Sequence, residues 1–258
     1  MPVVFIGHGS PMNAIEDSEF SVNWENLGRS LPRPDAILCI SAHWETRGTL
    51  VTAMEKPRTI HDFGGFPQEL FQVQYPAPGS PRLAAATQAA INGTKEVFDQ
   101  DWGLDHGSWS VLKRMYPQAD VPVVQLSLDY TKQASDHYAL AGNLAALRKQ
   151  NVLIVGSGNM VHNLRRLVLK GSDFNRPFGL DWALEANELF KKLINADRHR
   201  ELINYQQLGE PAGLAVPTPE HFLPMLYILA LKEAGETVSY FNDKPVAGSL
   251  TMTSFIIQ

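Results

Sequence analysis

The stretch Val3-Val4-Phe5-Ile6-Gly7-His8-Gly9-Ser10-Pro11 (VVFIGHGSP) joins four apolar residues to a glycine-rich turn. A short apolar run that ends at a turn is typical of a strand buried on both faces of a sheet. Two glycines allow the backbone a tight path after the strand, and Pro11 stiffens the exit. The first strand is therefore expected to end at an imidazole, His8, that is held on a bare turn.

The rest of the chain alternates strands and helices. Phe20, Trp24, Leu27 and Leu31 recur with the spacing of one helix face. Apolar runs predict strands at 36–40, 49–53, near 97, at 121–128, at 152–155 and at 250–256. Helices are expected at 83–91, from 109, at 134–148, at 180–194 and at 218–230. This order predicts an α/β fold, a single domain over residues 1–258 with a central, largely parallel sheet, mixed at its edges and flanked by helices.

The composition limits the classes of protein to which the chain can belong. With 258 residues, of which 44% are hydrophobic, the chain is long enough to bury a full core. A net charge of −5 without any basic run argues against nucleic acid or an anionic membrane surface as a partner. No apolar stretch has transmembrane length, and the chain starts directly with a strand-like run. Neither a membrane span nor a signal peptide is therefore expected.

The single cysteine, Cys39, permits no disulfide within the chain. Together with the lack of a signal peptide, this predicts a cytoplasmic protein. Cys39 lies between Leu38 and Ile40 in a predicted strand, so it is expected to be a small buried apolar residue rather than a nucleophile. The sequence leaves the oligomeric state open.

The histidines carry the strongest chemical signal among the 258 residues. His8 and His43 end predicted strands, His162 follows a later strand and a Gly-Ser-Gly turn, and His221 lies in the first turn of a predicted helix. Ligands of open α/β sheets bind outside the carboxyl ends of the strands. Several imidazoles at one sheet edge can bind a metal ion. Two further histidines, on polar helical stretches, are expected to be solvated: His137 and His199.

Two other motifs are weaker. The sequence VGSGN at 155–159 follows a strand, but Val161 stands where a dinucleotide-binding turn has its third glycine. Ser10 in HGS could be a nucleophile beside an oxyanion loop. However, Pro11 has no N–H to donate, and the chain contains no G-x-S-x-G elbow.

Seven strings follow one another along the chain and together cover nearly all of it: GHGSPMN (7–13), SAHWETRG (41–48), TIHDFGGFPQELFQVQYPAPGSP (59–81), DHGSWSVL (105–112), VPVVQLS (121–127), GSGNMVHNLR (156–165) and PTPEHFLPMLY (217–227). In this order they resemble the 4,5-DOPA extradiol dioxygenase family. This family is a branch of the class III extradiol ring-cleavage dioxygenases and is related to the catalytic subunit of protocatechuate 4,5-dioxygenase.

The resemblance implies roles for five histidines. His8, His43 and His221 match the metal ligands of the family. His162 matches the acid/base residue close to the metal, and in a zinc-loaded form it could be a fourth ligand. His106 matches a histidine that hydrogen-bonds on the substrate side.

The ligand set departs from that of related ring-cleavage enzymes, which use two histidines and one carboxylate. Here Glu220 comes directly before His221. Neighbouring residues of a helix point about 100° apart, so both are not expected to bind one ion, and the closer branch of the family favours His221. A three-histidine set suits zinc as well as iron. A zinc-loaded sample is then expected to be inactive as an oxygenase.

The resemblance implies an enzyme that inserts both atoms of O2 into a catechol such as DOPA. A non-haem Fe(II) ion would support this reaction, and the product would be of the muconic semialdehyde type (seco-DOPA). Two alternatives stay open: a zinc hydrolase that uses metal-bound hydroxide, and a metal-binding module without catalysis. The natural catechol stays open too, because pocket shape depends on the loop 56–81. His61 in this loop is expected either at the pocket mouth or in a purely structural role.

Overall fold

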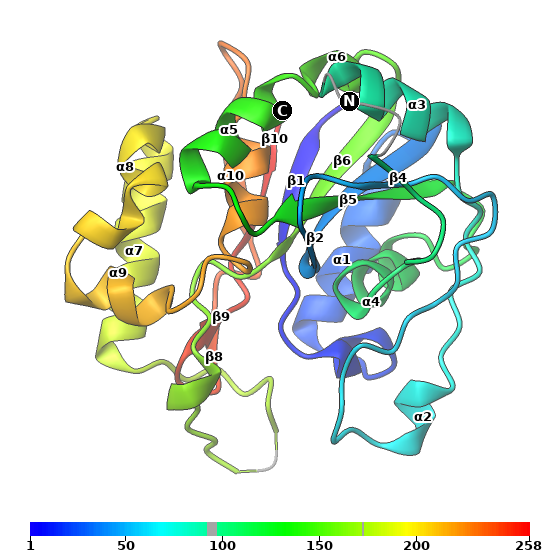
Figure 1. Ribbon diagram of the computed structural model, residues 1–258. Coiled ribbons are helices and arrows are strands. Elements are labelled where there is room, and N and C mark those ends of the chain that lie inside the picture. Colours follow the sequence, from blue (N-terminus) through cyan, green and yellow to red (C-terminus); the bar gives the residue numbers. More distant parts are fainter. Residues whose placement is uncertain (92–96, 172) are drawn as a thin grey trace.

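The computed structural model describes residues 1–91, 97–171 and 173–258. An eight-stranded sheet forms its centre (Figure 1). The strands are, in order across the sheet, β4 (Phe98–Asp99), β3 (Val51–Thr52), β5 (Val123–Asp129), β2 (Ala36–Thr46), β6 (Val152–Gly158), β1 (Val3–Gly7), β10 (Ser254–Ile257) and β7 (Val238–Phe241). A separate pair, β8 (Pro245–Val246) and β9 (Leu250–Thr251), is antiparallel.

The four central strands β5, β2, β6 and β1 run parallel to one another. Antiparallel pairs lie outside them: β10 pairs with β1 and β7, and β3 pairs with β5. The predicted α/β fold, with a largely parallel sheet that is mixed at its edges, is therefore confirmed.

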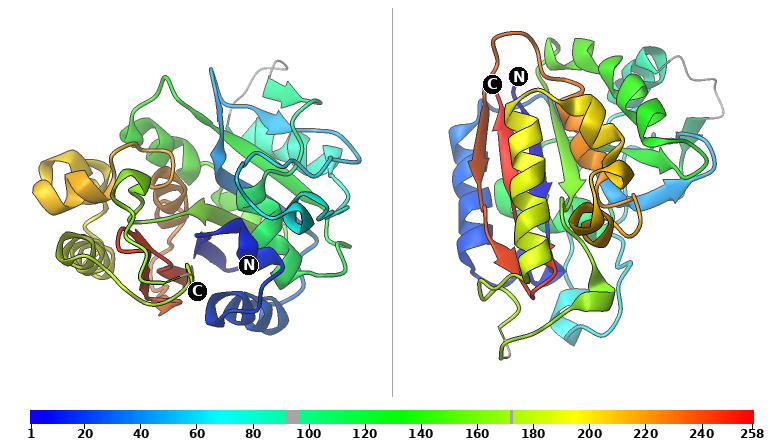
Figure 2. Two further views of the ribbon diagram at one scale, coloured as in Figure 1. Left: turned by 90° about the horizontal axis from the view of Figure 1, so that it is seen from below. Right: turned by 90° about the vertical axis from the view of Figure 1, so that its left-hand side faces the viewer.

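Helices cover both faces of the sheet, as the two further views show (Figure 2). The helices are α1 (Glu19–Ser30), α2 (Gln68–Phe71), α3 (Pro81–Ala90), α4 (His106–Met115), α5 (Ala134–Gly142), α6 (Ala145–Arg148), α7 (Asp181–Asn195), α8 (His199–Ile203), α9 (Glu210–Ala215) and α10 (Leu223–Leu229). Helices α1 and α4 pack together on one face. Helices α3, α5 and α10 pack on the other, and α7, α8 and α9 pack on one another beside it (Figure 1, left). No helix among the described residues is long and apolar enough to span a membrane.

The strand β1 is buried on both sides, which explains its unbroken apolar sequence. Val3 and Phe5 point into the core beneath α10, whereas Val4 and Ile6 point into the core beneath α1 and α4. All four side chains are 0% exposed. Because side chains alternate across a strand, these four residues contribute to the hydrophobic cores on both faces of the sheet.

Two strands continue where the sequence predicts their ends. β2 runs on to Thr46, and its register with β5 shifts between Ile40 and Glu45, so His43 lies inside an irregular strand rather than after it. β6 runs through Gly156-Ser157-Gly158, where a turn was expected. A Cβ on Gly156 would lie 2.5 Å from the carbonyl oxygen of Pro224, and one on Gly158 would lie 2.2 Å from that of His221. These glycines are therefore needed for close packing, not for a turn.

Several helix boundaries also differ from those predicted. The helix expected at 134–148 is divided into α5 and α6, and the C-terminal strand is divided at 252–253. α4 begins at His106, three residues before Trp109, because the Asp105 side chain accepts the N–H of Ser108 and caps the helix. The helix expected from 218 begins at Leu223, and a turn precedes it.

The expectation that His137 and His199 are solvated is wrong. His137 is 2% exposed, and its ring nitrogens lie 2.9 Å from the Tyr227 hydroxyl and 3.2 Å from the Asp129 carbonyl. The His199 side chain is 13% exposed, and its Nδ1 lies 2.8 Å from the Tyr138 hydroxyl. Each histidine lies on the inner side of a short helix with a tyrosine as its partner. Cys39 is 0% exposed, as predicted.

Candidate metal centre and active site

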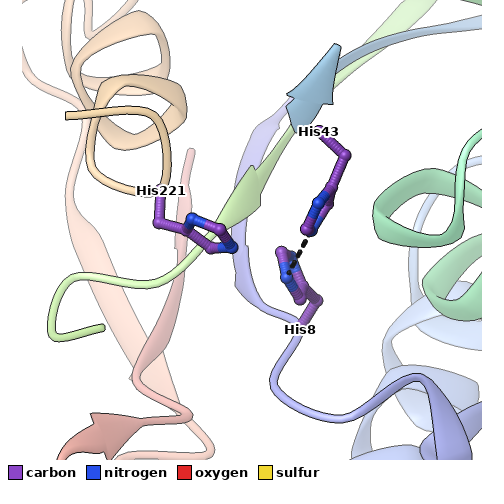
Figure 3. Close-up of side chains that lie close together, drawn as sticks. All are labelled: His8, His43 and His221. Carbon is purple, nitrogen blue, oxygen red and sulfur yellow. Dashed lines mark hydrogen bonds between the residues drawn. The ribbon is translucent and has the colours of Figure 1, made fainter. Parts of the chain in front are cut away.

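Three histidines from separate elements meet at one edge of the sheet (Figure 3). His8 follows β1, His43 lies in the irregular part of β2, and His221 lies in the turn before α10. One ring nitrogen from each lies within 4.8 Å of the others. The Nε2 atoms of His8 and His43 are 3.1 Å apart. Nitrogens bound to one ion at about 2.1 Å are at most about 4.2 Å apart, and the His8–His43 pair lies within this limit.

Two more of the sequence-predicted histidines flank this group. The His162 ring stacks on that of His221, with ring centroids 3.5 Å apart and planes 6° from parallel. The His106 ring centroid lies 3.8 Å from that of His43. The structure thus brings together all five histidines that the sequence singled out for the site.

The hydrogen bonds around His8 determine which of its ring nitrogens carries the proton. The Ser157 hydroxyl donates to the carbonyl oxygen of Gly107 at 2.5 Å. Its oxygen lies 3.0 Å from His8 Nδ1 and can then only accept there. His8 is therefore protonated at Nδ1, and its Nε2 lone pair faces His43.

Glu220 has the same effect on His221. Its Oε1 lies 3.1 Å from His221 Nδ1 and accepts a second bond from Thr218 Oγ1 at 2.8 Å. Burial alone would raise the pKa of Glu220, but its hydrogen bonds, above all the one with His221, lower it to about 2. The ionised carboxylate requires Nδ1–H on His221 and leaves Nε2 free. Glu220 reaches its neighbour because 217–222 form a turn, whereas the sequence argument assumed a helix.

The surroundings favour the neutral form of four of these histidines. Burial, followed by the neighbouring imidazoles, lowers the pKa values of His8 and His43 well below their usual range. The pKa of His221 is lowered as well, mainly by burial, and that of His162 is lowered to about 3 by burial and by His221. Neutral imidazoles are the donors that Fe(II) or Zn(II) requires, so this set fits such an ion.

A buried polar network around Asp105 holds the backbone of His43 in the histidine cluster. The carboxylate of Asp105 accepts bonds from Ser41 Oγ and Gln125 Nε2, both at 2.7 Å. Ser41 Oγ in turn accepts the N–H of His43 at 3.2 Å. Burial raises the pKa of Asp105, and the bonds from Gln125 and Ser41 oppose this. This network could not be predicted from the sequence, because its members come from three separate elements.

Sequence reasoning also missed Asp62. Its Oδ2 lies 2.9 Å from Nδ1 of His106 and 3.8 Å from Nδ1 of His43. The neighbouring His61 turns elsewhere: its Nε2 lies 2.9 Å from the Val73 carbonyl, and its ring packs on Trp109. His61 is absent from the lining of the cavity, so of its two expected places it has the structural one.

A cavity of about 720 Å³ opens above the histidine cluster. His8, His43, His106, His162 and His221 all line it. Its apolar walls come from several segments and include Met12, Phe63, Phe66, Leu164, Leu167 and Phe174. Glu16 and Asp173 also line it, and both extend into a neighbouring hollow that has none of these histidines. The two carboxylates therefore lie on the side away from the cluster.

Histidines that could hold a metal ion, at the base of a cavity with aromatic walls, are the arrangement expected of a metal-dependent α/β enzyme. The chain belongs to the family described as the catalytic LigB subunit of aromatic ring-opening dioxygenase, which residues 2–247 match.

Curated relatives narrow the class. The chain is 47% identical to the 4,5-DOPA dioxygenase extradiol of Escherichia coli strain K12, over 98% of this chain and 93% of the relative. It is 40% identical to the protein of the same name from Beta vulgaris, over 90% and 86%. A crystal structure of an uncharacterized protein from Escherichia coli K12 superposes with a TM-score of 0.84 at 41% identity, over 100% of both chains.

The protein is therefore an extradiol ring-cleavage dioxygenase, as its sequence strings predicted. This finding decides against the zinc hydrolase and against the non-catalytic metal-binding module.

Proposed function

We propose that the enzyme inserts both atoms of O2 into a catechol such as DOPA at a non-haem Fe(II) ion held by His8, His43 and His221. The product would be a muconic semialdehyde-type compound, seco-DOPA in the case of DOPA. The observation that carries the proposal is the convergence of these three imidazoles at the base of a cavity with aromatic walls. Two relatives carry the name 4,5-DOPA dioxygenase extradiol, which supports the choice of DOPA as substrate.

Fe(II) held by His8, His43 and His221 would bind the catechol and O2 and would lower the pKa of the phenols. The protein residues then move and hold protons. His162 lines the cavity beside His221, where it is placed to accept a phenolic proton and return it later. His106 lies on the opposite side, against His43, where it can hydrogen-bond a substrate oxygen.

The same residues support a zinc-loaded form. Neutral imidazoles are good zinc ligands, and a fourth is available because His162 stacks directly on His221. Zinc has no redox chemistry, so this form would bind a catechol without oxygenating it. The cluster can then hold either Fe(II) or Zn(II), and only the iron-loaded form supports the reaction.

The charges around the cavity favour a catechol that carries an ammonium group. Glu16 and Asp173 line the cavity away from the histidines, and no lysine or arginine is among the described residues that line it. An ammonium group would be attracted to this side, whereas a lone carboxylate would be repelled. DOPA and related catechol amines fit this arrangement better than catechol acids.

The test is anaerobic reconstitution with Fe(II), followed by oxygen uptake with a panel of catechols. We expect one O2 consumed per catechol, a yellow product, and higher kcat/KM for catechols with an ammonium group than for protocatechuate. A zinc-reconstituted sample is the matched control and should consume no oxygen. If the iron-loaded protein consumed no oxygen with any catechol, the proposal would be wrong.

A further inference from the structure

Asp62 connects the loop between β3 and α2 to the first turn of α4. Its Oδ1 accepts the backbone N–H of His106 at 2.8 Å, and its Oδ2 lies 2.9 Å from Nδ1 of the same residue. The Asp62 side chain is only 17% exposed. The two carboxylate oxygens thus contact the same residue: one binds the backbone N–H of His106 and the other binds its ring.

This double contact determines the tautomer of His106. An ionised carboxylate can only accept, so His106 must donate from Nδ1. Burial alone would raise the pKa of Asp62, but the hydrogen bonds from His106 outweigh it and lower that pKa. A neutral imidazole with Nδ1–H has its lone pair on Nε2. Because Nδ1 is turned toward Asp62, Nε2 is the polar ring atom that His106 offers to the cavity.

Packing holds the ring in this orientation. The His106 ring meets Phe63 edge-on, with centroids 5.5 Å apart and planes at 86°, and lies 3.8 Å from the His43 ring on another side. Phe63 is the residue directly after Asp62. The same loop thus supplies both the carboxylate that orients the ring and an aromatic contact that confines it.

We propose that Asp62 is a positioning residue that holds His106 as the Nδ1–H tautomer, so that Nε2 accepts a hydrogen bond from a substrate hydroxyl. The choice of a catechol hydroxyl as the donor rests on the proposed function, whereas the tautomer does not. Asp62 also lies within 4.8 Å of His43 as part of a group that could hold an ion, and the test has to separate that role from positioning.

The decisive variant is Asp62→Asn. Its amide oxygen can still accept the backbone N–H, but its NH2 group would face His106 and force the lone pair onto Nδ1. Long-range 1H–15N NMR of the histidine-labelled, zinc-loaded protein reads the tautomer directly, with the signals assigned by their loss in His106→Gln. We expect protonated Nδ1 in the unmodified protein and protonated Nε2 in Asp62→Asn.

The kinetic readout complements the NMR spectrum. In the iron-loaded enzyme, Asp62→Asn should lower kcat by about 10- to 100-fold, as loss of an outer partner of an active-site histidine commonly does, and leave metal content unchanged. Asp62→Glu, which keeps the carboxylate, should restore part of kcat. Asp101→Asn removes an exposed carboxylate that does not line the cavity and should change neither readout.

Three results would overturn the inference: protonated Nε2 in the unmodified protein, an unchanged tautomer in Asp62→Asn, or loss of one metal equivalent in Asp62→Asn. The last would make Asp62 a ligand rather than a positioning residue. If the protein turned over no catechol, the proposed function would fail, but the NMR experiment would still decide the role of Asp62.

Discussion

At the residue scale, the histidines of the cluster are distinguished by what holds their Nδ1 atoms. Ser157 accepts from His8, Glu220 accepts from His221, and Asp62 accepts from His106. Each of these oxygen atoms leaves an Nε2 lone pair for an ion or a substrate. Outer partners of this kind orient metal-binding imidazoles and increase their basicity. We therefore expect the cluster to depend on residues that touch no ion.

Ser157→Ala tests this dependence. The substitution removes the acceptor for His8 Nδ1 and leaves the Gly107 carbonyl without its donor. We expect the affinity for Zn(II), measured by competition with a chelator, to fall about 10- to 100-fold. Ser110→Ala is the matched control, since Ser110 is also buried but its hydroxyl has no hydrogen-bond partner among the described residues. Equal affinities of the two variants would contradict the role of Ser157.

A second prediction separates ligand from acid/base residue. His8→Ala removes one of three converging nitrogens, so the protein should lose the metal itself. His162→Ala leaves the three in place, so it should keep the metal but lose at least about 100-fold in kcat, the usual contribution of a positioned proton-transfer group. Metal analysis and oxygen uptake on both variants give the readouts. Near-normal turnover in His162→Ala would show that this assignment is wrong.

At the scale of elements, the sequence predicted more of the site than of its surroundings. The apolar run of β1 and its glycine turn correctly predicted where His8 lies relative to the sheet. The extension of β6 through Gly156 and Gly158 could not be predicted, because it depends on the backbone of Pro224 and His221, over sixty residues away in the chain. Asp62 was missed for a similar reason, since its loop is irregular and its partner lies on α4.

The pairing of α5 with α10 leads to a prediction about pH. His137 lies on α5 and is buried against Tyr227 of α10. Burial lowers the pKa of His137, although the Asp129 carbonyl opposes the shift. Below its ordinary value of about 6.5, the unfolded chain binds a proton that the folded chain excludes. The stability of the metal-free protein should therefore fall as the pH falls below about 6.5.

Urea unfolding of the metal-free protein between pH 5 and pH 8 measures this effect. His137→Gln should reduce the slope of the unfolding free energy by up to about 1.4 kcal/mol per pH unit below pH 6.5 and leave the slope above it unchanged. The buried histidines of the cluster add to the slope in both proteins, so the difference isolates His137. Parallel curves for the two proteins would contradict the expected shift.

At the scale of the whole molecule, the parallel centre of the sheet accounts for the position of the site. Gly7 of β1 lies opposite Gly158 of β6 in the parallel pair, so the residues that follow the two strands lie at the same edge of the sheet. His8 follows at once, and the backbone of His221 packs directly on Gly158. The sheet thus brings together the proposed ligands, which are far apart in sequence, and loops on either side close the cavity. This convergence is the central claim about the enzyme.

Anomalous diffraction from anaerobically grown crystals of the Fe(II)-loaded protein, recorded at the iron edge, tests that claim most directly. We expect one strong peak within bonding distance of the Nε2 atoms of His8, His43 and His221, with Glu220 and Asp62 outside bonding distance. The described residues also contain two other groups that could hold an ion: His43, Asp62 and His106, and His162, Glu220 and His221. An iron peak bonded to Asp62 or Glu220 would contradict the account.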